Sequence, residues 1–268
     1  LLSIKYFIRI FIYRISYNKI KFMDHKFKLP TEQVELPSKG LLYPEDSPLA
    51  TGTIEMKYMT AKEEDILTNQ NYIENGTVID KLLKSLIVTE GVDYDSILIG
   101  DKNAIMMAAR VLSYGKDYEI KVLGEVHTVD LSALENKEVD YSLFKKGEND
   151  FTFKLPHTDN TVTIKILTHK DEELIDREIK GNKKINKNSS TITTSRLKYI
   201  ITSINDSRDK KDIREFVDNY CLAKDARAIR EFYSSISPDV DMVYYKEGRE
   251  EAADIPIGIG FFWPDAAV

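Results

Sequence analysis

The side chains best suited to catalysis or metal binding are scattered through the sequence. The four histidines are His25, His127, His157 and His169, and no two of them have the spacing that places a pair of metal ligands on one helix face. Three of them flank a region of strand-like sequence, where surface or turn positions are the simpler interpretation. We therefore expect no metal site.

An acidic triplet offers a second candidate for chemistry. The segment TAKEEDIL contains Glu63, Glu64 and Asp65, which could suggest a metal site or an acid–base pair. Thr60 precedes Glu63 by three residues, however, and this spacing is typical of a capping box at the start of a helix. Acids in a first helical turn also interact favourably with the helix dipole. The pattern predicts a helix that begins after Thr60.

The single cysteine, Cys221, cannot form a disulfide within the chain, and no histidine is close to it in sequence. We expect it to be a small buried apolar side chain within a helix. The sequence also lacks a phosphate-binding P-loop, a dinucleotide-binding GxGxxG after a strand, and the HExxH and GxSxG motifs. These observations favour a protein that is not an enzyme and that uses no cofactor or small-molecule substrate.

Composition narrows the range of partners. The chain has 268 residues, of which 42% are hydrophobic, and a formal net charge of −6. An acidic balance argues against broad nucleic-acid binding. The polar, lysine-rich stretch at 181–195 is interpreted as an exposed linker, with a local nucleic-acid contact as the other reading.

The periodicity of apolar residues predicts an α+β fold, in which a mostly helical body follows an N-terminal extended segment. Within the part spanning 23–116, TGTIEMKYM alternates as a strand does, and apolar stripes predict helices over 77–88 and 100–115. Four alternating segments within 117–167 predict a small antiparallel sheet. The part from 168 to 250 reads as helical, including SRLKYIITSI and one long helix from Asp212.

Residues 251–268 form an extended, aromatic tail by the same reasoning, because Pro256, Gly258 and Gly260 disfavour a helix. Its candidate site residues are Phe261, Phe262, Trp263 and Pro264. Two uses of this cluster remain open. The rings could fold back and bury themselves in their own domain, or they could dock in a partner as aromatic anchors.

The first 22 residues stand apart, since they carry five Lys or Arg and no acid. Translation of an AT-rich region upstream of Met23 is one reading. A basic amphipathic segment on a membrane surface and a signal or transmembrane segment are the others. Charges at Lys5, Arg9 and Arg14 interrupt every long apolar run, so we expect no stable membrane insertion.

Several segments in a fixed order carry a resemblance to a known family. VELPSKGLLYP, TGTIEMKYMTAKEEDIL, LLKSLI, ILIGDKNAIMMAARVLSYG and YEIKV follow one another, and the chain later contains NYCLAKDARAIREFYSSISPDVDM and IPIGIGFFWPD. Together they resemble the baseplate hub protein family of T-even-type contractile-tailed bacteriophages. Relatives often have cysteine pairs resembling zinc knuckles, whereas the two corresponding stretches here, LGEVHTVDL and YYKEGREEAADIP, contain none.

The resemblance implies a structural subunit of a phage tail baseplate hub, which acts through protein–protein contacts with other hub and tail proteins. The alternative that it implies is an assembly chaperone that helps to build the hub without remaining in it. The chain would accordingly be located in the tail baseplate of the virion, or in the host cytoplasm during assembly. Without the cysteines, hydrogen bonding and packing must hold the two hairpins.

Overall fold

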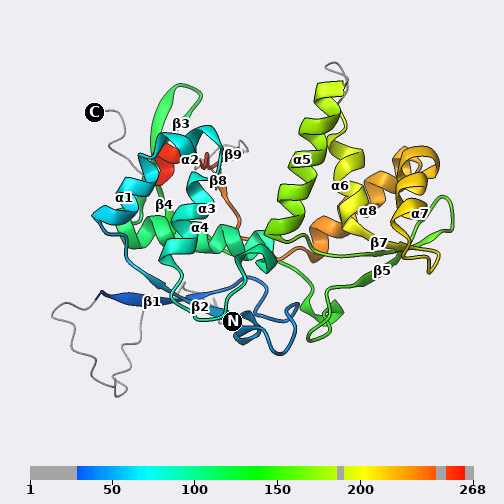
Figure 1. Cartoon of the computed structure of the whole chain (residues 1–268), viewed down its shortest axis with the longest axis horizontal. Helices are drawn as coiled ribbons and strands as arrows, with labels where there is room; N and C mark the ends of the chain where they lie inside the picture. The colour runs from blue at the N-terminus through cyan, green and yellow to red at the C-terminus, as the bar shows by residue number, and fades with distance from the viewer. Residues whose placement is uncertain (1–28, 186–189, 246–251, 263–268) are drawn as a thin grey trace, which may run out of the picture.

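The structure, a computed structural model, describes residues 29–185, 190–245 and 252–262. Two lobes lie side by side along the long axis of the molecule (Figure 1). The first lobe contains the chain up to about residue 136 together with the C-terminal elements, and the second contains residues from about 149 to 238. Helices and small antiparallel sheets occur in both lobes, which confirms the predicted α+β class. The expectations for residues 1–22 lie outside the described residues.

The first lobe opens with an antiparallel pair, β1 (Thr31–Glu35) and β2 (Thr53–Lys57). The loop between them contains a short 3-10 helix, η1 (Pro48–Thr51), and folds tightly on itself. Gly40 has a positive φ of 74°, and a side chain there would lie 2.5 Å from the backbone nitrogen of Gly52. Only glycine fits this close approach without a shift of the backbone.

Four helices follow in the first lobe: α1 (Ala61–Leu67), α2 (Gln70–Glu74), α3 (Val78–Leu86) and α4 (Ile99–Tyr114). The predicted inward face of α3 is confirmed, because Val78, Leu82, Leu83 and Leu86 are all buried. The predicted end of α4 at Gly115 is also confirmed.

The four strands expected to form one sheet within 117–167 belong to two sheets instead. β3 (Asp117–Val122) and β4 (Glu125–Asp130) form a separate hairpin on the first lobe. β5 (Phe151–Lys154) and β6 (Thr161–Ile164) pair in the second lobe, where β7 (Ile201–Ile204) adds a third strand. Two 3-10 turns, η3 (Leu131–Ala133) and η4 (Tyr141–Leu143), lie on the segment between the two sheets.

The helices of the second lobe are α5 (His169–Ile185), α6 (Ile192–Ile200), α7 (Lys210–Glu215) and α8 (Ala223–Ile236). The expected linker at 181–195 is therefore wrong in most of its described part, since α5 extends into it and α6 begins before it ends. SRLKYIITSI is not wholly helical, because the chain leaves α6 at Ile200 and becomes β7. The β-branched run at this point favours an extended backbone.

The long helix expected from Asp212 is interrupted. A π-helical turn, η5 (Phe216–Tyr220), follows α7, and the backbone is extended at Cys221. Cys221 thus lies between helices rather than within one, and it is half-buried rather than buried. Phe216 and Val217 before the break and Ile229 of α8 after it are all buried.

After α8 the chain returns to the first lobe. The carbonyl oxygen of Pro238 lies so close to Gly100 that a side chain there would approach it to 1.8 Å. Val240 then bridges Asn136, and the antiparallel pair β8 (Val243–Tyr245) and β9 (Ala252–Asp254) leads to the short helix α9 (Ile259–Phe262). The chain therefore crosses between the lobes twice.

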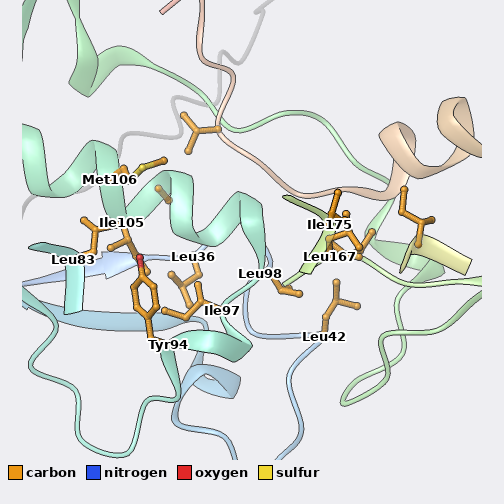
Figure 2. Close-up of a cluster of buried hydrophobic side chains, with 14 of the residues drawn as sticks. Leu36, Leu42, Leu83, Tyr94, Ile97, Leu98, Ile105, Met106, Leu167 and Ile175 are labelled. Atoms are coloured by element: carbon orange, nitrogen blue, oxygen red, sulfur yellow. The ribbon is translucent and has the colours of Figure 1, made fainter. Parts of the chain in front are cut away.

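Backbone hydrogen bonds also join the two lobes directly, at a joint between the start of α4 and the start of α5. Ile99 donates to the carbonyl of Leu167 at 3.1 Å, and His169 donates to the carbonyl of Ile97 at 2.8 Å. Figure 2 shows Leu98 between buried side chains of the first lobe, such as Ile105, and buried side chains of the second lobe, such as Leu167. The hydrophobic core is therefore continuous through the joint.

Candidate functional site

The aromatic tail, the candidate site from the sequence, is helical at its described end. Phe261 and Phe262 belong to α9, so the expectation of a fully extended tail is wrong at this point. Their side chains are 1% and 0% exposed. Trp263 and Pro264 lie outside the described residues.

Contacts with the first lobe account for this burial. The ring of Phe261 packs edge-on against Tyr118 of β3, with 4.9 Å between ring centroids and an interplanar angle of 73°. The hydroxyl of Tyr118 donates a hydrogen bond to the carbonyl of Pro256 at 3.2 Å. A second edge-on contact joins Phe261 to Phe262, with 5.1 Å between centroids. One tyrosine therefore holds both the extended part of the tail and its terminal helix.

A buried arginine packs against the same region of the first lobe. Arg110 of α4 is 3% exposed, and its guanidinium donates hydrogen bonds to the carbonyls of Gly115 at 2.8 Å and Asp117 at 3.1 Å. Its Cζ lies 5.8 Å from the centroid of the Tyr118 ring. Burial lowers the pKa of Arg110 from its usual range. The arginine fixes the turn between α4 and β3, on which the packing of the tail depends.

The expectation that His169 is a surface or turn residue is wrong. Its side chain is 4% exposed at the start of α5, packed edge-on against Tyr94 with 4.7 Å between ring centroids. Lys102 of α4 lies 3.1 Å from His169 Nδ1 and 2.6 Å from Asp80 Oδ1. Because an ammonium can only donate, Nδ1 accepts and the proton of the neutral ring is on Nε2.

Among the described residues, the Nε2 atom of His169 has no hydrogen-bond partner, and its nearest carboxylate oxygens are at 3.7 Å on Asp80 and 3.9 Å on Glu173. Burial, followed by the charge of Lys102, lowers the pKa of His169. A neutral imidazole beside an ammonium could transfer protons. The ring is enclosed by Tyr94 and the surrounding chain, however, so a substrate has no access to it, and the arrangement serves to join the lobes.

The other histidines are separate from this group. His127 on β4 stacks at a tilt on Tyr244, with 5.5 Å between ring centroids, and His157 is exposed on the turn between β5 and β6. His25 lies outside the described residues. Within the described ranges, no three His, Cys, Asp or Glu side chains are grouped in a way that could hold a metal ion.

A second buried polar cluster is centred on Asp101, in the first turn of α4. Its carboxylate accepts hydrogen bonds from the backbone N–H of Ser38 at 2.9 Å, the Ser38 hydroxyl at 2.6 Å and the Tyr43 hydroxyl at 2.7 Å. Tyr43 in turn accepts from the backbone N–H of Leu98 at 2.9 Å. Burial raises the pKa values of both Asp101 and Tyr43. The cluster attaches the N-terminal loop to α4.

The acidic triplet behaves as the capping-box prediction requires. The Glu63 carboxylate accepts from the backbone N–H of Thr60 at 3.0 Å and from the Thr60 hydroxyl at 2.6 Å. Glu63 is fully buried and pairs with Lys57 at 2.7 Å. Glu64 and Asp65 are exposed.

Cys221 has a thiol whose pKa is raised by burial, which disfavours the reactive thiolate.

Little in the sequence indicates these clusters. Tyr118 alternates with Ile120 in a strand pattern, but the pattern says nothing of its contact with Pro256. Asp101 resembles any first-turn acid, and Lys102 resembles any surface lysine. Each acquires its role from a residue more than 20 positions away, such as Ser38 for Asp101 or Asp80 for Lys102.

The geometry thus defines a protein whose buried polar groups fasten elements to one another, and sequence comparison is consistent with this. The family described as T4 bacteriophage base plate protein matches residues 27–243. The chain belongs to this family. No match was found among curated proteins or among solved structures.

Proposed function

We propose that this chain is a structural subunit of the hub of a phage tail baseplate, and that it acts through protein–protein contacts during virion assembly. The family match over residues 27–243 is the observation that carries the proposal. The family implies a role in the baseplate, and the hub assignment is the finer step proposed here. It rests on the ordered resemblance of segments such as VELPSKGLLYP and IPIGIGFFWPD to hub proteins.

The character of the buried polar groups supports a structural role. Asp101, Glu63 and Arg110 each direct their hydrogen bonds to the chain itself and join segments distant in sequence or turns between elements. Such networks give a subunit a fixed shape, which a partner can then recognise. The proposal assigns no catalytic role, no cofactor and no nucleic-acid contact.

For the tail, we propose that Phe261 and Phe262 are packing residues of the first lobe. Their burial against Tyr118 supports this role over docking in a partner. Trp263 and Pro264 remain candidates from the sequence for either role.

The proposed partners are other hub and tail proteins of the same phage, and the proposed location is the virion tail. Among the helices of the described ranges, none combines the length and the apolar character needed to cross a membrane. An assembly chaperone that leaves the finished hub is the alternative. It shares the same family membership and differs only in whether the chain persists in the particle.

The proposal is tested first with a phage that lacks the gene for this chain. Electron microscopy of the infected-cell lysate should show heads without complete tails, and the wild-type chain supplied from a plasmid should restore infectious particles. Normal tails in the absence of the chain would overturn any role in the baseplate.

A further inference from the structure

The turn that joins β3 to β4 contains a leucine in a backbone conformation that disfavours it. Val122 pairs with Glu125, so the turn consists of Leu123 and Gly124, with φ angles of 51° and 89°. Two positive φ values in a two-residue hairpin turn define type I′, which favours asparagine followed by glycine. Gly124 meets this preference, whereas the Cβ of Leu123 opposes the left-handed conformation.

The same leucine is exposed. Leu123 is 75% exposed and Val126 is 63% exposed. The hairpin rises from the body of the first lobe (green in Figure 1). We call these two side chains the hairpin knob. Both side chains are apolar and exposed to water, and Leu123 also occupies a turn position where an asparagine would adopt the left-handed backbone conformation with less strain.

Packing within the lobe does not explain the knob. The inward face of the hairpin buries Ile120 and Val129, which are 4% and 5% exposed. Val126 belongs to the opposite face, because successive residues of a strand point to opposite sides. A strained backbone conformation that the core does not require is typical of functional sites.

A charge beside the knob restricts the kind of partner. Lys121 lies directly opposite Val126 in the strand register and is exposed. It has no ion-pair partner in the part of the chain that the structure describes, whereas Lys116 at the base of the hairpin pairs with Asp130. Glu119 lies on the same face, further from the turn. A partner that receives the knob can therefore place a carboxylate next to Lys121.

We propose that the hairpin knob inserts into an apolar pocket on another protein of the baseplate, and that a carboxylate at the rim of this pocket pairs with Lys121. This inference rests on the proposed function, because it takes the partner from the baseplate. An aliphatic side chain at a protruding turn can reach a pocket that the flat face of a sheet cannot. Burial there offsets the cost of leaving Leu123 and Val126 in water.

The test replaces Leu123 with the residue that the turn prefers. In the purified protein, Leu123→Asn should raise the melting temperature by about 2–4 °C, because it relieves the left-handed backbone. Supplied to the phage that lacks the chain, the same variant should lower the yield of infectious particles at least tenfold. Lys121→Glu should lower the yield without a change in melting temperature, while Leu123→Met should retain it.

Leu143→Asn is the matched control, since Leu143 is 49% exposed on a different segment and does not have a positive φ. It should change neither measurement. If the wild-type chain restores particles and Leu123→Asn restores them equally, the proposed docking of the hairpin knob is wrong, whereas the proposed function stands. If the phage needs no copy of the chain, the proposed function itself is wrong.

Two other binding partners for the hairpin knob would give different results. A fall in melting temperature in Leu123→Asn would mean that another part of this chain covers the leucine, and would overturn the inference. Light scattering that shows a dimer for the wild-type protein and a monomer for Leu123→Asn would identify the partner as a second copy, which also contradicts it.

Discussion

Asp101 and His169 illustrate how single side chains hold distant parts of this molecule together. Asp101 accepts three hydrogen bonds from the loop that precedes β2, and His169 receives a hydrogen bond from Lys102 across the joint between the lobes. Both are nearly or fully buried, so loss of a partner would leave a polar group without compensation. Their contribution to stability therefore depends on protonation.

The first prediction concerns acid and His169. Its pKa is lowered from the usual 6.5 in the folded protein, so the unfolded chain binds this proton more tightly. The stabilising contribution is complete above about pH 6.5 and is lost as the pH falls through the folded pKa. Between pH 6.5 and 5, the free energy of unfolding of the wild-type protein should therefore fall more steeply than that of His169→Gln. The difference in slope is at most about 1.4 kcal/mol per pH unit.

Denaturant unfolding at several pH values measures this difference. The glutamine variant removes one titrating group and leaves the others in place, so the comparison isolates His169 from the remaining histidines. Parallel pH profiles for the two proteins would show that His169 titrates alike in the folded and unfolded states.

At the scale of elements, the start of α1 depends on one threonine. Thr60→Ala removes the hydroxyl that donates to Glu63 at 2.6 Å, and we expect it to cost about 1 kcal/mol of unfolding free energy. Thr193→Ala is a suitable control, because Thr193 is exposed in the first turn of α6; its effect should stay within about 0.5 kcal/mol. Assembly of infectious particles should be unchanged for both variants. A loss of assembly at unchanged stability in Thr60→Ala would instead mark the turn as a binding site.

The terminal helix α9 provides a third prediction. Phe262 is fully buried, so Phe262→Ala should destabilise the isolated protein by roughly 3–5 kcal/mol through lost burial and a residual cavity. Tyr220→Ala removes an aromatic side chain that is 62% exposed and should change stability by less than about 1 kcal/mol. Thermal melts decide the matter: an unchanged transition in Phe262→Ala would mean that α9 is not held against the lobe in solution.

Elements whose cause is local could be predicted from the sequence. The stripe in α3, the cap at Thr60 and the end of α4 at Gly115 all follow from spacings of a few residues. The change from helix to strand after Ile200 could not, because the apolar residues from 201 to 204 suit one face of a helix as well as a buried strand. Pairing of β7 with β6, about 40 residues earlier, decides in favour of the strand.

The same distinction applies to the candidate site. Aromatic character alone identified Phe261 and Phe262, but it could not separate packing from docking. The deciding contact is with Tyr118, about 140 positions earlier in the chain. Leu123 was equally hidden, since a Leu-Gly pair between two strands predicts a turn without revealing that the leucine is the strained residue.

At the scale of the whole molecule, the two lobes share one hydrophobic core, and the chain crosses between them twice. Gly100 is in contact with the second crossing at Pro238, while Leu98 lies at the joint where α4 and α5 begin. A subunit built in this way presents its surfaces in a fixed relative arrangement, which suits a component of a larger symmetric assembly. The membership of the T4 bacteriophage base plate protein family agrees with this use.

We propose that the chain is a structural subunit of the baseplate hub, and quantitative mass spectrometry of purified virions is the decisive test. Peptides of this chain should be present in gradient-purified particles, at a fixed copy number relative to the other hub proteins and in every preparation. Absence of the chain from mature particles, together with its presence in assembly intermediates, would contradict the claim and identify an assembly chaperone.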